Sequence, residues 1–430
     1  MRAGLRGNGF KMVSLTSSPI NLSTSVEFKQ SLKRSIRLAF SVPIAFIIVL
    51  TIRALRSVCL IRVGALKSDR IGHFALETDL MILEQRHNIR PRPKHSLDIF
   101  YAPEPISNRV VYEMWKRVLR VWPNWLMVPV FRLNRILPGS SLHQVPNTTS
   151  TCLDVHNLID GAPPNLFFTA NEIMYGNKIL KEMGVGEGDR FICLIVRDAA
   201  YTRKVFPQKD MSYHDYRNCD IDDYILATEA IAERGIYVFR MGSIVEKPLV
   251  STHPFVIDYA NSKFRSDFMD VFLGSRCEFC VSDGLGFYAI PATFRRPNAY
   301  VNYSPFHMFY SSRAGDLGIA KTVSFLKTGN RLNLSQMGET GASQFSRTAQ
   351  FLDAGVSIDS NTPEEIRDLV LEMLDRVEGK WIPQSGDKEL QVQFWQKYAE
   401  VIGEQRLICH GEIRAKYGAQ FLRGNQDWIL

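Results

Sequence analysis

Short apolar runs alternate with amphipathic stretches along most of this chain. In its first part, the runs at residues 58–64 and 97–102 are mostly apolar and predict buried strands. Residues 74–85 and 107–119 instead repeat apolar side chains at helical spacing, and we expect Ser107 to be the N-cap of the second helix. Strands that alternate with helices predict a parallel, doubly wound α/β sheet.

The same alternation is clearer from residue 190 onward. Strands are predicted at residues 190–198, 236–242, 254–260, 278–283 and 299–303, and helices at 220–235 and 266–275. Near the C-terminus, Thr362, Pro363 and Glu365 supply an N-cap, a proline at the first helical position and a capping box. These patterns predict a second α/β unit followed by helices.

The length predicts two domains. At 430 residues the chain is too long for one ordinary core, and domains of about 150–200 residues are expected. Residues 138–190 are rich in Pro, Gly, Asn and Thr, which predicts a linker with one possible helix at 170–183. The expected order is a disordered segment (1–28), an apolar basic helix (29–56), an α/β domain with linker (57–185), a second α/β domain (186–380) and a helical tail (381–430). We expect the two Rossmann-like domains to face each other across a cleft.

Positive charge is concentrated in the N-terminal arm. The net charge is +8, yet residues 1–62 hold ten Lys or Arg and one acid, which is +9 and leaves −1 for the rest. A nucleic-acid partner is not expected, since its basic surface would lie on the folded body. Residues 38–52 are uncharged and mostly apolar between Arg37 and Arg53, but they are shorter than the ~20 residues of a spanning helix and contain Pro43. We expect a helix on the surface of the membrane, with a buried helix or a true span as alternatives.

Charged residues and glycines follow the predicted strands of the second half, and ligands bind at the carboxyl ends of strands in such sheets. These residues are Arg197, Arg240, Gly242, Asp258, Ser282, Asp283, Gly284 and Gly286. Ordinary turn chemistry is one explanation. Arginines at two strand ends and a glycine turn at a third suit a diphosphate better, because guanidinium forks and backbone N–H groups both bind phosphate oxygens.

The matching feature of the first half is the sequence SDRIGH, at the first junction from strand to helix. It contains Asp69, Arg70, Gly72 at the start of the helix, and His73 in the first turn. If the two halves face each other, either His73 or Asp69 could take a proton from an acceptor hydroxyl, with Arg70 and Gly72 in the same loop. A helix cap at Asp69 with a packed or solvated histidine is an equal alternative on spacing alone.

Neither a metal nor another cofactor is expected. Asp220 and Asp222 have the spacing of a metal-binding pair, but they open an amphipathic helix, where acids interact favourably with the helix dipole. Cys277 and Cys280 have no second pair at zinc spacing and are interpreted as structural thiols. Seven scattered cysteines indicate a reducing compartment.

Four strings of the sequence are specific enough to point to a family: IRVGALKSDRIGHFALETDL, VWPNWL, DGLGFYAIPATFRRPNAYVN and NTPEEIRDLVLEML. They resemble a family of bacterial glycosyltransferases found with surface-polysaccharide genes, and the resemblance covers about residues 55–400. It implies the two-domain GT-B type, with an acceptor-side N-terminal domain and a C-terminal domain that binds the nucleotide sugar. The strand ends are more distantly similar to the donor sites of fucosyl- and heptosyltransferases.

The expected function is transfer of a sugar from a nucleotide-diphosphate donor to a surface-glycan or lipid-linked acceptor. Arg197, Arg240 and the N–H groups of Gly284 and Gly286 would hold the diphosphate, and Asp258 would recognise the base or ribose. We expect a metal-independent, inverting enzyme that is cytoplasmic and lies on the inner face of the cell membrane. The alternative is a non-catalytic, membrane-tethered protein that binds nucleotide sugar or glycan and scaffolds an assembly complex.

Overall fold

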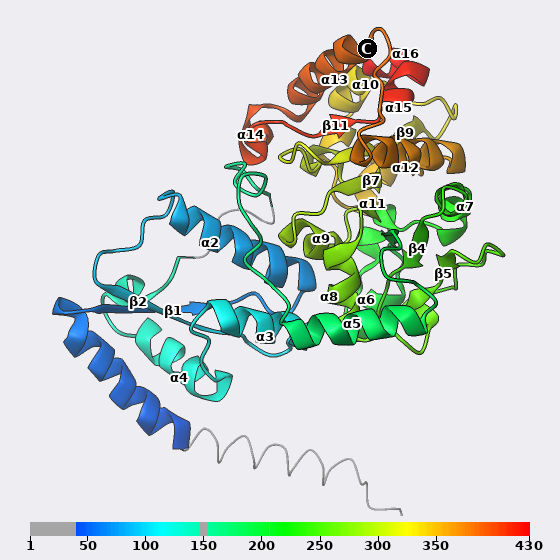
Figure 1. Ribbon diagram of the computed structural model, residues 1–430. Coiled ribbons are helices and arrows are strands. Elements are labelled where there is room, and N and C mark those ends of the chain that lie inside the picture. Colours follow the sequence, from blue (N-terminus) through cyan, green and yellow to red (C-terminus); the bar gives the residue numbers. More distant parts are fainter. Residues whose placement is uncertain (1–39, 147–152, 206) are drawn as a thin grey trace, which may run out of the picture.

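The computed structural model describes residues 40–146, 153–205 and 207–430, which form two α/β halves that pack on each other (Figure 1). The disorder predicted for residues 1–28 and the first part of the predicted helix at 29–56 lie outside the described residues. The α/β class with an apolar N-terminal helix, predicted from the sequence, is confirmed.

The first half is built on a small parallel sheet. Strand β1 (Leu60–Ala65) pairs with β2 (Ser96–Tyr101), and parallel bridges add one chain segment beyond each strand, Val63 to Gln144 and Phe100 to Val121. Its helical elements are the N-terminal helix (residues 40–54), η1 (Leu55–Ser57), η2 (His73–Glu77), α2 (Thr78–Arg86), α3 (Arg109–Val118), α4 (Asn124–Arg135) and η3 (Ser140–His143).

The predicted cap of α3 is wrong by one residue. Asn108, not Ser107, is the N-cap, and its Oδ1 accepts hydrogen bonds from the backbone N–H groups of Val110 and Val111 at 2.9 and 3.0 Å. The backbone N–H of Ser107 donates to the carbonyl of Ser68 at 2.8 Å, so Ser107 belongs to the loop after β2, which contacts the loop after β1.

The second half contains a seven-stranded parallel sheet in the order β11-β8-β7-β6-β3-β4-β5. The strands are β3 (Phe191–Ile195), β4 (Tyr237–Arg240), β5 (Val256–Ile257), β6 (Cys280–Ser282), β7 (Asn298–Tyr303), β8 (Leu317–Ala320) and β11 (Lys416–Tyr417). From β3 the chain builds β4 and β5 on one side and then returns to build β6, β7 and β8 on the other. The direction of winding therefore reverses between β3 and β6, which is the position where doubly wound sheets bind ligands.

Helices connect the strands of this sheet and follow them along the chain. They are α5 (Ala170–Glu182), α6 (Ala200–Val205), η4 (Ser212–Arg217), η5 (Ile221–Tyr224), α7 (Ile225–Ala232), η6 (Tyr259–Asn261), α8 (Asp267–Arg276), η7 (Gly286–Tyr288), α9 (Ala289–Thr293), η8 (Phe306–Met308), α10 (Leu334–Glu339), η9 (Ala342–Gln344), α11 (Thr348–Asp353) and α12 (Pro363–Val377). A separate antiparallel pair is formed by β9 (Thr322–Phe325) and β10 (Val356–Asp359). The capping box predicted at Thr362 is confirmed, because its side chain accepts from the backbone N–H of Glu365 and the Glu365 carboxylate accepts from the backbone N–H of Thr362.

The C-terminal segment completes the second half. It contains α13 (Asp387–Ile402), α14 (Glu404–Leu407), η10 (Ile408–His410), β11, α15 (Ala419–Gly424) and α16 (Gln426–Ile429). Tyr417 of β11 is fully buried and packs against Phe394 of α13, with 3.9 Å between ring centroids and 34° between the ring planes. Residues 381–430 thus supply an edge strand and an aromatic part of the core, in addition to helices.

The two halves meet through buried polar contacts and backbone packing. Asp79 of α2 has a fully buried side chain, and its carboxylate accepts from Arg295 at 2.7 Å and from Asn165 at 2.7 Å. Helix α9 packs on η2, and α3 packs on α8, where the Asn108 amide donates to the carbonyl of Asp267 at 3.0 Å. These contacts hold the SDRIGH loop of the first half against the second.

Candidate functional site

The site is at the carboxyl ends of β3 and β6. Ile195 and Ser282 are register partners at the ends of these two strands. Just beyond them, the backbone N–H of Arg197 donates to Oδ2 of Asp283 at 2.6 Å, and the N–H of Gly284 donates to the hydroxyl of Ser282 at 3.1 Å. The structure therefore brings together four residues predicted from the two strand ends.

A second arginine, which the sequence did not predict, joins this group. Arg217 is the last residue of η4, and its Nη2 donates to the carbonyl of Gly284 at 3.1 Å. The Nε groups of Arg197 and Arg217 are both buried without a hydrogen-bond partner. Burial lowers the pKa of the Arg197 guanidinium, and the nearby charge of Arg217 lowers it further. Two guanidinium groups with unpaired Nε–H donors therefore lie close to each other in a partly buried site. This arrangement is unfavourable unless an anion binds there.

Asp283 is the buried acid among these cations. Burial raises the pKa of its carboxyl group, while the bond from the Arg197 backbone and the charges of Arg197, Arg217 and Lys321 oppose that rise. Its Oδ1 is buried without a partner. The single charge of this carboxylate offsets part of the charge of the three cations that act on it, Arg197, Arg217 and Lys321.

His214 shows how far the positive field extends. Its pKa is lowered to about 4, first by burial and then by the charges of Arg197, Arg217, Arg70 and Arg347. These arginines come from four separate segments of the chain, and one of them, Arg70, belongs to the SDRIGH loop of the first half. His214 is therefore neutral near pH 7. We call these four arginines, with His214 and Asp283, the switch-point cluster.

The SDRIGH loop and the loop after β6 contact each other at two glycines, Gly72 and Gly286. A Cβ built on Gly72 would lie 3.1 Å from the Cα and from the carbonyl oxygen of Gly286. Gly284 has a φ of +81°, and a Cβ there would lie 2.8 Å from the ring of Tyr303. Packing and a left-handed backbone thus explain why these positions hold glycine, and donation of their N–H groups to phosphate stays a prediction.

Arg240 and Asp258 form a pair at the ends of β4 and β5. The Arg240 side chain is about 1% exposed and donates to Asp258 at 3.3 Å and to the carbonyl of Lys247 at 3.2 Å. Asp258 also accepts from the backbone of Leu249 at 3.2 Å. Gly242 follows with a φ of 151°. Part of the predicted guanidinium fork of Arg240 is therefore bound within the protein, although its buried Nε has no partner.

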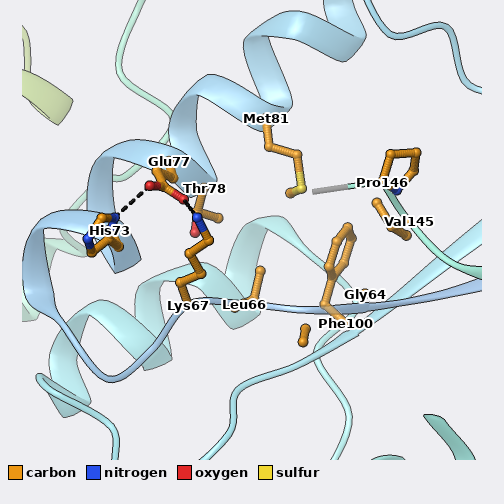
Figure 2. A pocket seen from close by; sticks show the side chains of 11 residues that line it. Gly64, Leu66, Lys67, His73, Glu77, Thr78, Met81, Phe100, Val145 and Pro146 are labelled. Atoms are coloured by element: carbon orange, nitrogen blue, oxygen red, sulfur yellow. Dashed lines mark hydrogen bonds and ion pairs between the residues drawn. The ribbon is translucent and has the colours of Figure 1, made fainter. Parts of the chain in front are cut away.

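His73 is oriented by a carboxylate in the first half (Figure 2). Its Nδ1 lies 2.5 Å from Oε1 of Glu77, and Oε2 of Glu77 lies 2.6 Å from Nζ of Lys67. Burial acts to raise the pKa of Glu77, but the hydrogen bonds from His73 and Lys67 outweigh it and hold the pKa below its usual value. An ionised Glu77 fixes the proton on Nδ1, which leaves Nε2 as the basic nitrogen of the ring.

The two residues predicted as the general base, His73 and Asp69, have different surroundings. A small pocket of about 30 Å³ borders His73 and Glu77 and is also lined by apolar side chains, including Met81, Phe100 and Val145. Asp69 is exposed and precedes the helical residues, which begin at Ile71, so among the described residues it has no carboxylate or other buried partner of the kind that Glu77 provides for His73. Of the two candidates, only His73 has a carboxylate that sets its orientation.

In the described residues, no group of three or more His, Cys, Asp or Glu side chains is arranged to hold a metal ion. Asp220 and Asp222 both form ion pairs with Lys247, at 2.5 and 2.6 Å, and Asp220 caps the helical turn that it was predicted to open. Cys277 and Cys280 are buried free thiols.

Sequence reasoning missed Arg217, His214 and Arg347. None of them follows a strand. Arg217 and His214 lie in η4, one of the short helices between β3 and α7, and Arg347 immediately precedes α11. The available signal was local: Tyr213, His214, Tyr216 and Arg217 place cationic and aromatic side chains within five positions of the chain.

Comparison with known proteins gives distant structural similarities. No protein-family model matches the chain, and no curated protein sequence matches it. A structure of a glycosyl transferase family 9 protein from Veillonella parvula aligns at 9% identity and a TM-score of 0.40, over 73% of this chain and 98% of its own. Two E. coli proteins align at a TM-score of 0.32. ADP-heptose LPS heptosyltransferase II aligns at 12% identity over 57% of this chain and 86% of its own. A heptosyltransferase with ADP aligns at 10% identity over 60% of this chain and 91% of its own.

Proposed function

We propose that this protein transfers a sugar from a nucleoside-diphosphate donor that binds at the switch-point cluster. The observation that carries the proposal is the position of Arg197 and Arg217. Their unpaired Nε groups lie at the strand ends where the winding of the sheet reverses. A diphosphate supplies the negative charge and the acceptor oxygens that these groups lack.

The cluster suits the chemistry of the leaving group as well as its binding. When the bond from sugar to diphosphate breaks, negative charge grows on the diphosphate, and fixed guanidinium groups stabilise it without a metal ion. Arg197 and Arg217 fill that role, with the N–H of Gly286 as a further candidate donor. Asp258 and Gly242, at the next strand ends, are the proposed contacts for the base or ribose. Arg240 then acts by holding Asp258 in place.

The acceptor is activated from the first half. Nε2 of His73 takes the proton of the acceptor hydroxyl, the oxygen attacks the anomeric carbon, and the diphosphate leaves from the opposite face with inversion. Glu77 holds the imidazole ring in position. The proximity of Gly72 to Gly286 supports this division of labour, because it places the loop that carries the base against the loop that carries Asp283.

The choice of sugar transfer over other uses of a nucleotide rests on the sequence strings that resemble surface-polysaccharide glycosyltransferases. The same resemblance supports a surface-glycan or lipid-linked acceptor and a place on the inner face of the membrane. The carboxylate-oriented His73 favours an enzyme over a non-catalytic scaffold, since a binding protein has no need of an oriented base.

Isothermal titration calorimetry with UDP, GDP, ADP and CDP tests the proposal. We expect one of them to bind, and Arg197→Ala to weaken it by about tenfold to a hundredfold, the effect of losing a charged hydrogen bond worth about 1.5–3 kcal/mol. Arg203→Ala is the matched control, because Arg203 lies on the next helix and pairs with Glu246 at the surface. The proposal fails if no nucleotide binds, or if Arg197→Ala and Arg203→Ala bind it equally well.

A further inference from the structure

The N-terminal helix (residues 40–54) is attached to the first half by one narrow face. Ser41, Ala45, Val49 and Ile52 are buried, and their spacing places them on a single stripe of the helix. Ala45 and Val49 pack in one cluster with Met127 and Val130 of α4, Val63 of β1, and Ile99 and Tyr101 of β2. The helix is therefore part of the folded domain (Figure 1).

The rest of its surface is apolar and exposed. Phe40, Val42, Ile44, Phe46, Ile47 and Leu50 have exposed fractions between 41% and 72%. The sequence has no charged residue from 38 to 52, and the hydroxyl of Thr51 donates to the carbonyl of Ile47 at 2.8 Å, which removes its need for water. A contiguous apolar surface of this kind on a soluble domain marks a place where something binds.

The helix end is fixed in direction by an arginine. Nε and Nη2 of Arg53 donate to Oδ1 of Asn134 at 3.2 and 3.0 Å, and Nη1 donates to the carbonyl of Pro138 at 2.8 Å. These bonds tie the C-terminal end of the helix to the end of α4. The exposed face consequently has a fixed orientation relative to the sheet of the first half.

We propose that this exposed face lies flat in the interface of an anionic lipid bilayer and fixes the orientation of the first half on the membrane. Phe40–Ser57 is the one stretch of the described residues that is long and apolar enough to cross a membrane, with 18 residues. At 1.5 Å per residue it is about 27 Å long, slightly short of a bilayer core of about 30 Å. A spanning orientation would also pull Ala45 and Val49 away from the protein core that they already contact.

Charge selects lipid over other partners. In the sequence, Arg53 and Arg56 follow the apolar stretch of residues 38–52, and Lys33, Arg34 and Arg37 precede it. Basic flanks around an apolar helix match anionic headgroups around an acyl core, whereas a second copy of the same surface would bring like charges together. This inference is independent of the donor site and holds whether or not a nucleotide binds.

Flotation with vesicles tests the surface. We expect the full chain to float with vesicles of phosphatidylcholine and phosphatidylglycerol, and far less with phosphatidylcholine alone. The double variant Phe46→Glu/Ile47→Glu should reduce the floating fraction at least tenfold at an unchanged melting temperature, because both side chains point away from the core. Val250→Glu is the matched control, since Val250 is 68% exposed on the second half.

Equal flotation of the double variant and the control overturns the proposal. So does a wild-type protein that stays with the buffer and forms dimers that the double variant loses, because the occupant is then a second copy. Deleting residues 1–54 is a poorer test, since it also uncovers Met127 and Val130.

A depth measurement separates the flat orientation from a span. Nitroxide labels at Phe40→Cys, Phe46→Cys and Leu50→Cys, in a background with Cys59→Ser, Cys152→Ser, Cys219→Ser and Cys409→Ser, report immersion in the bilayer at three positions along the helix. A helix in the plane gives similar, shallow depths at all three. A steady gradient of depth from residue 40 to residue 50 overturns the flat orientation.

Discussion

Gly72 and Gly286 face each other at the junction of the two halves, so closely that a Cβ on Gly72 would lie 3.1 Å from the Cα and the carbonyl oxygen of Gly286. The contact is one of backbone on backbone, which has little freedom to yield. It joins the loop of the proposed base, His73, to the loop that contains Asp283. The proposed chemistry depends on the relative position of these two loops, and the two glycines set it.

Gly72→Ala should therefore disturb both folding and transfer. The added methyl group has no room, and overpacking of this kind costs about 1–3 kcal/mol. We expect denaturant unfolding to show that loss and turnover to fall, while nucleotide affinity changes little because the arginines of the second half remain. Gly161→Ala is the control, since a Cβ at Gly161 meets no atom within 4 Å. Equal stability of the two variants would show that the junction yields easily.

Asp283→Asn should strengthen anion binding and weaken the fold. The amide oxygen can still accept from the backbone of Arg197, but the negative charge that partly balances Arg197 and Arg217 is lost. We expect pyrophosphate and the nucleotide to bind about tenfold more tightly, the size of one removed charge interaction. The free protein should melt at a lower temperature. Asp210→Asn is the matched control, because Asp210 is exposed and likewise accepts from a backbone N–H, that of Ser212. Weaker binding in Asp283→Asn would mean that the carboxylate itself contacts the ligand.

The α/β class and most elements of the second half were predictable because their signals are local. The spacing of apolar residues defines β3, β6 and α12, and the cap at Thr362 needs only four residues. Arg197 and Asp283 were found because strand ends are visible in the sequence and always lie at one edge of a parallel sheet. The error at Ser107 has the same origin, since two adjacent residues can both cap and only the loop path decides.

The rest of the site depends on tertiary structure. Arg217 and His214 reach the cluster from the short helix η4 and Arg347 from the residue before α11, and no spacing in the sequence relates them to Arg197. Arg240 was visible at a strand end, but its partner could not be predicted. An arginine at a strand end can bind either a ligand or a carboxylate from the next strand, and Arg240 pairs with Asp258. The buried stripe of the N-terminal helix could not be predicted from the sequence pattern either, because the exposed and buried faces of this helix are both apolar.

Arg295→Met should destabilise the junction strongly. Arg295 pairs with the fully buried Asp79 at 2.7 Å, and loss of one partner of a buried pair costs about 3–5 kcal/mol. Burial already raises the pKa of Asp79, and loss of Arg295 raises it further. The stability deficit should thus shrink as the pH falls from 7 to 5 and Asp79 takes up a proton. Arg109→Met, which breaks an exposed pair with Glu104, should cost no more than about 1 kcal/mol. Urea unfolding at both pH values measures the two effects, and a pH-independent deficit would contradict the account.

Glu77→Gln tests whether Glu77 is ionised in the folded protein. Its folded pKa lies below the unfolded value of about 4.3, so its charge stabilises the protein above that pH, and this contribution is lost as the pH falls through the folded pKa. The free energy of unfolding of the variant should be lower than that of the wild type near pH 7, and the gap should close below about pH 4. A gap that stays constant with pH would mean that the Glu77 carboxyl is not the charged partner of Lys67.

His73→Ala should reduce turnover by about 10²–10⁴-fold, the usual contribution of a positioned general base. The affinity for the nucleotide should remain within about twofold, because every proposed donor contact except Arg70 belongs to the second half. Stopped-time assays with the donor and calorimetry on the same preparations measure the two quantities. Asp69→Asn is the matched variant of the same loop and should keep full activity, since Asp69 is exposed and has no partner that would orient it as His73 is oriented by Glu77. If Asp69→Asn abolishes turnover and His73→Ala does not, Asp69 is the base and the ion pair of His73 with Glu77 is structural. If neither substitution changes turnover, the base does not come from this loop.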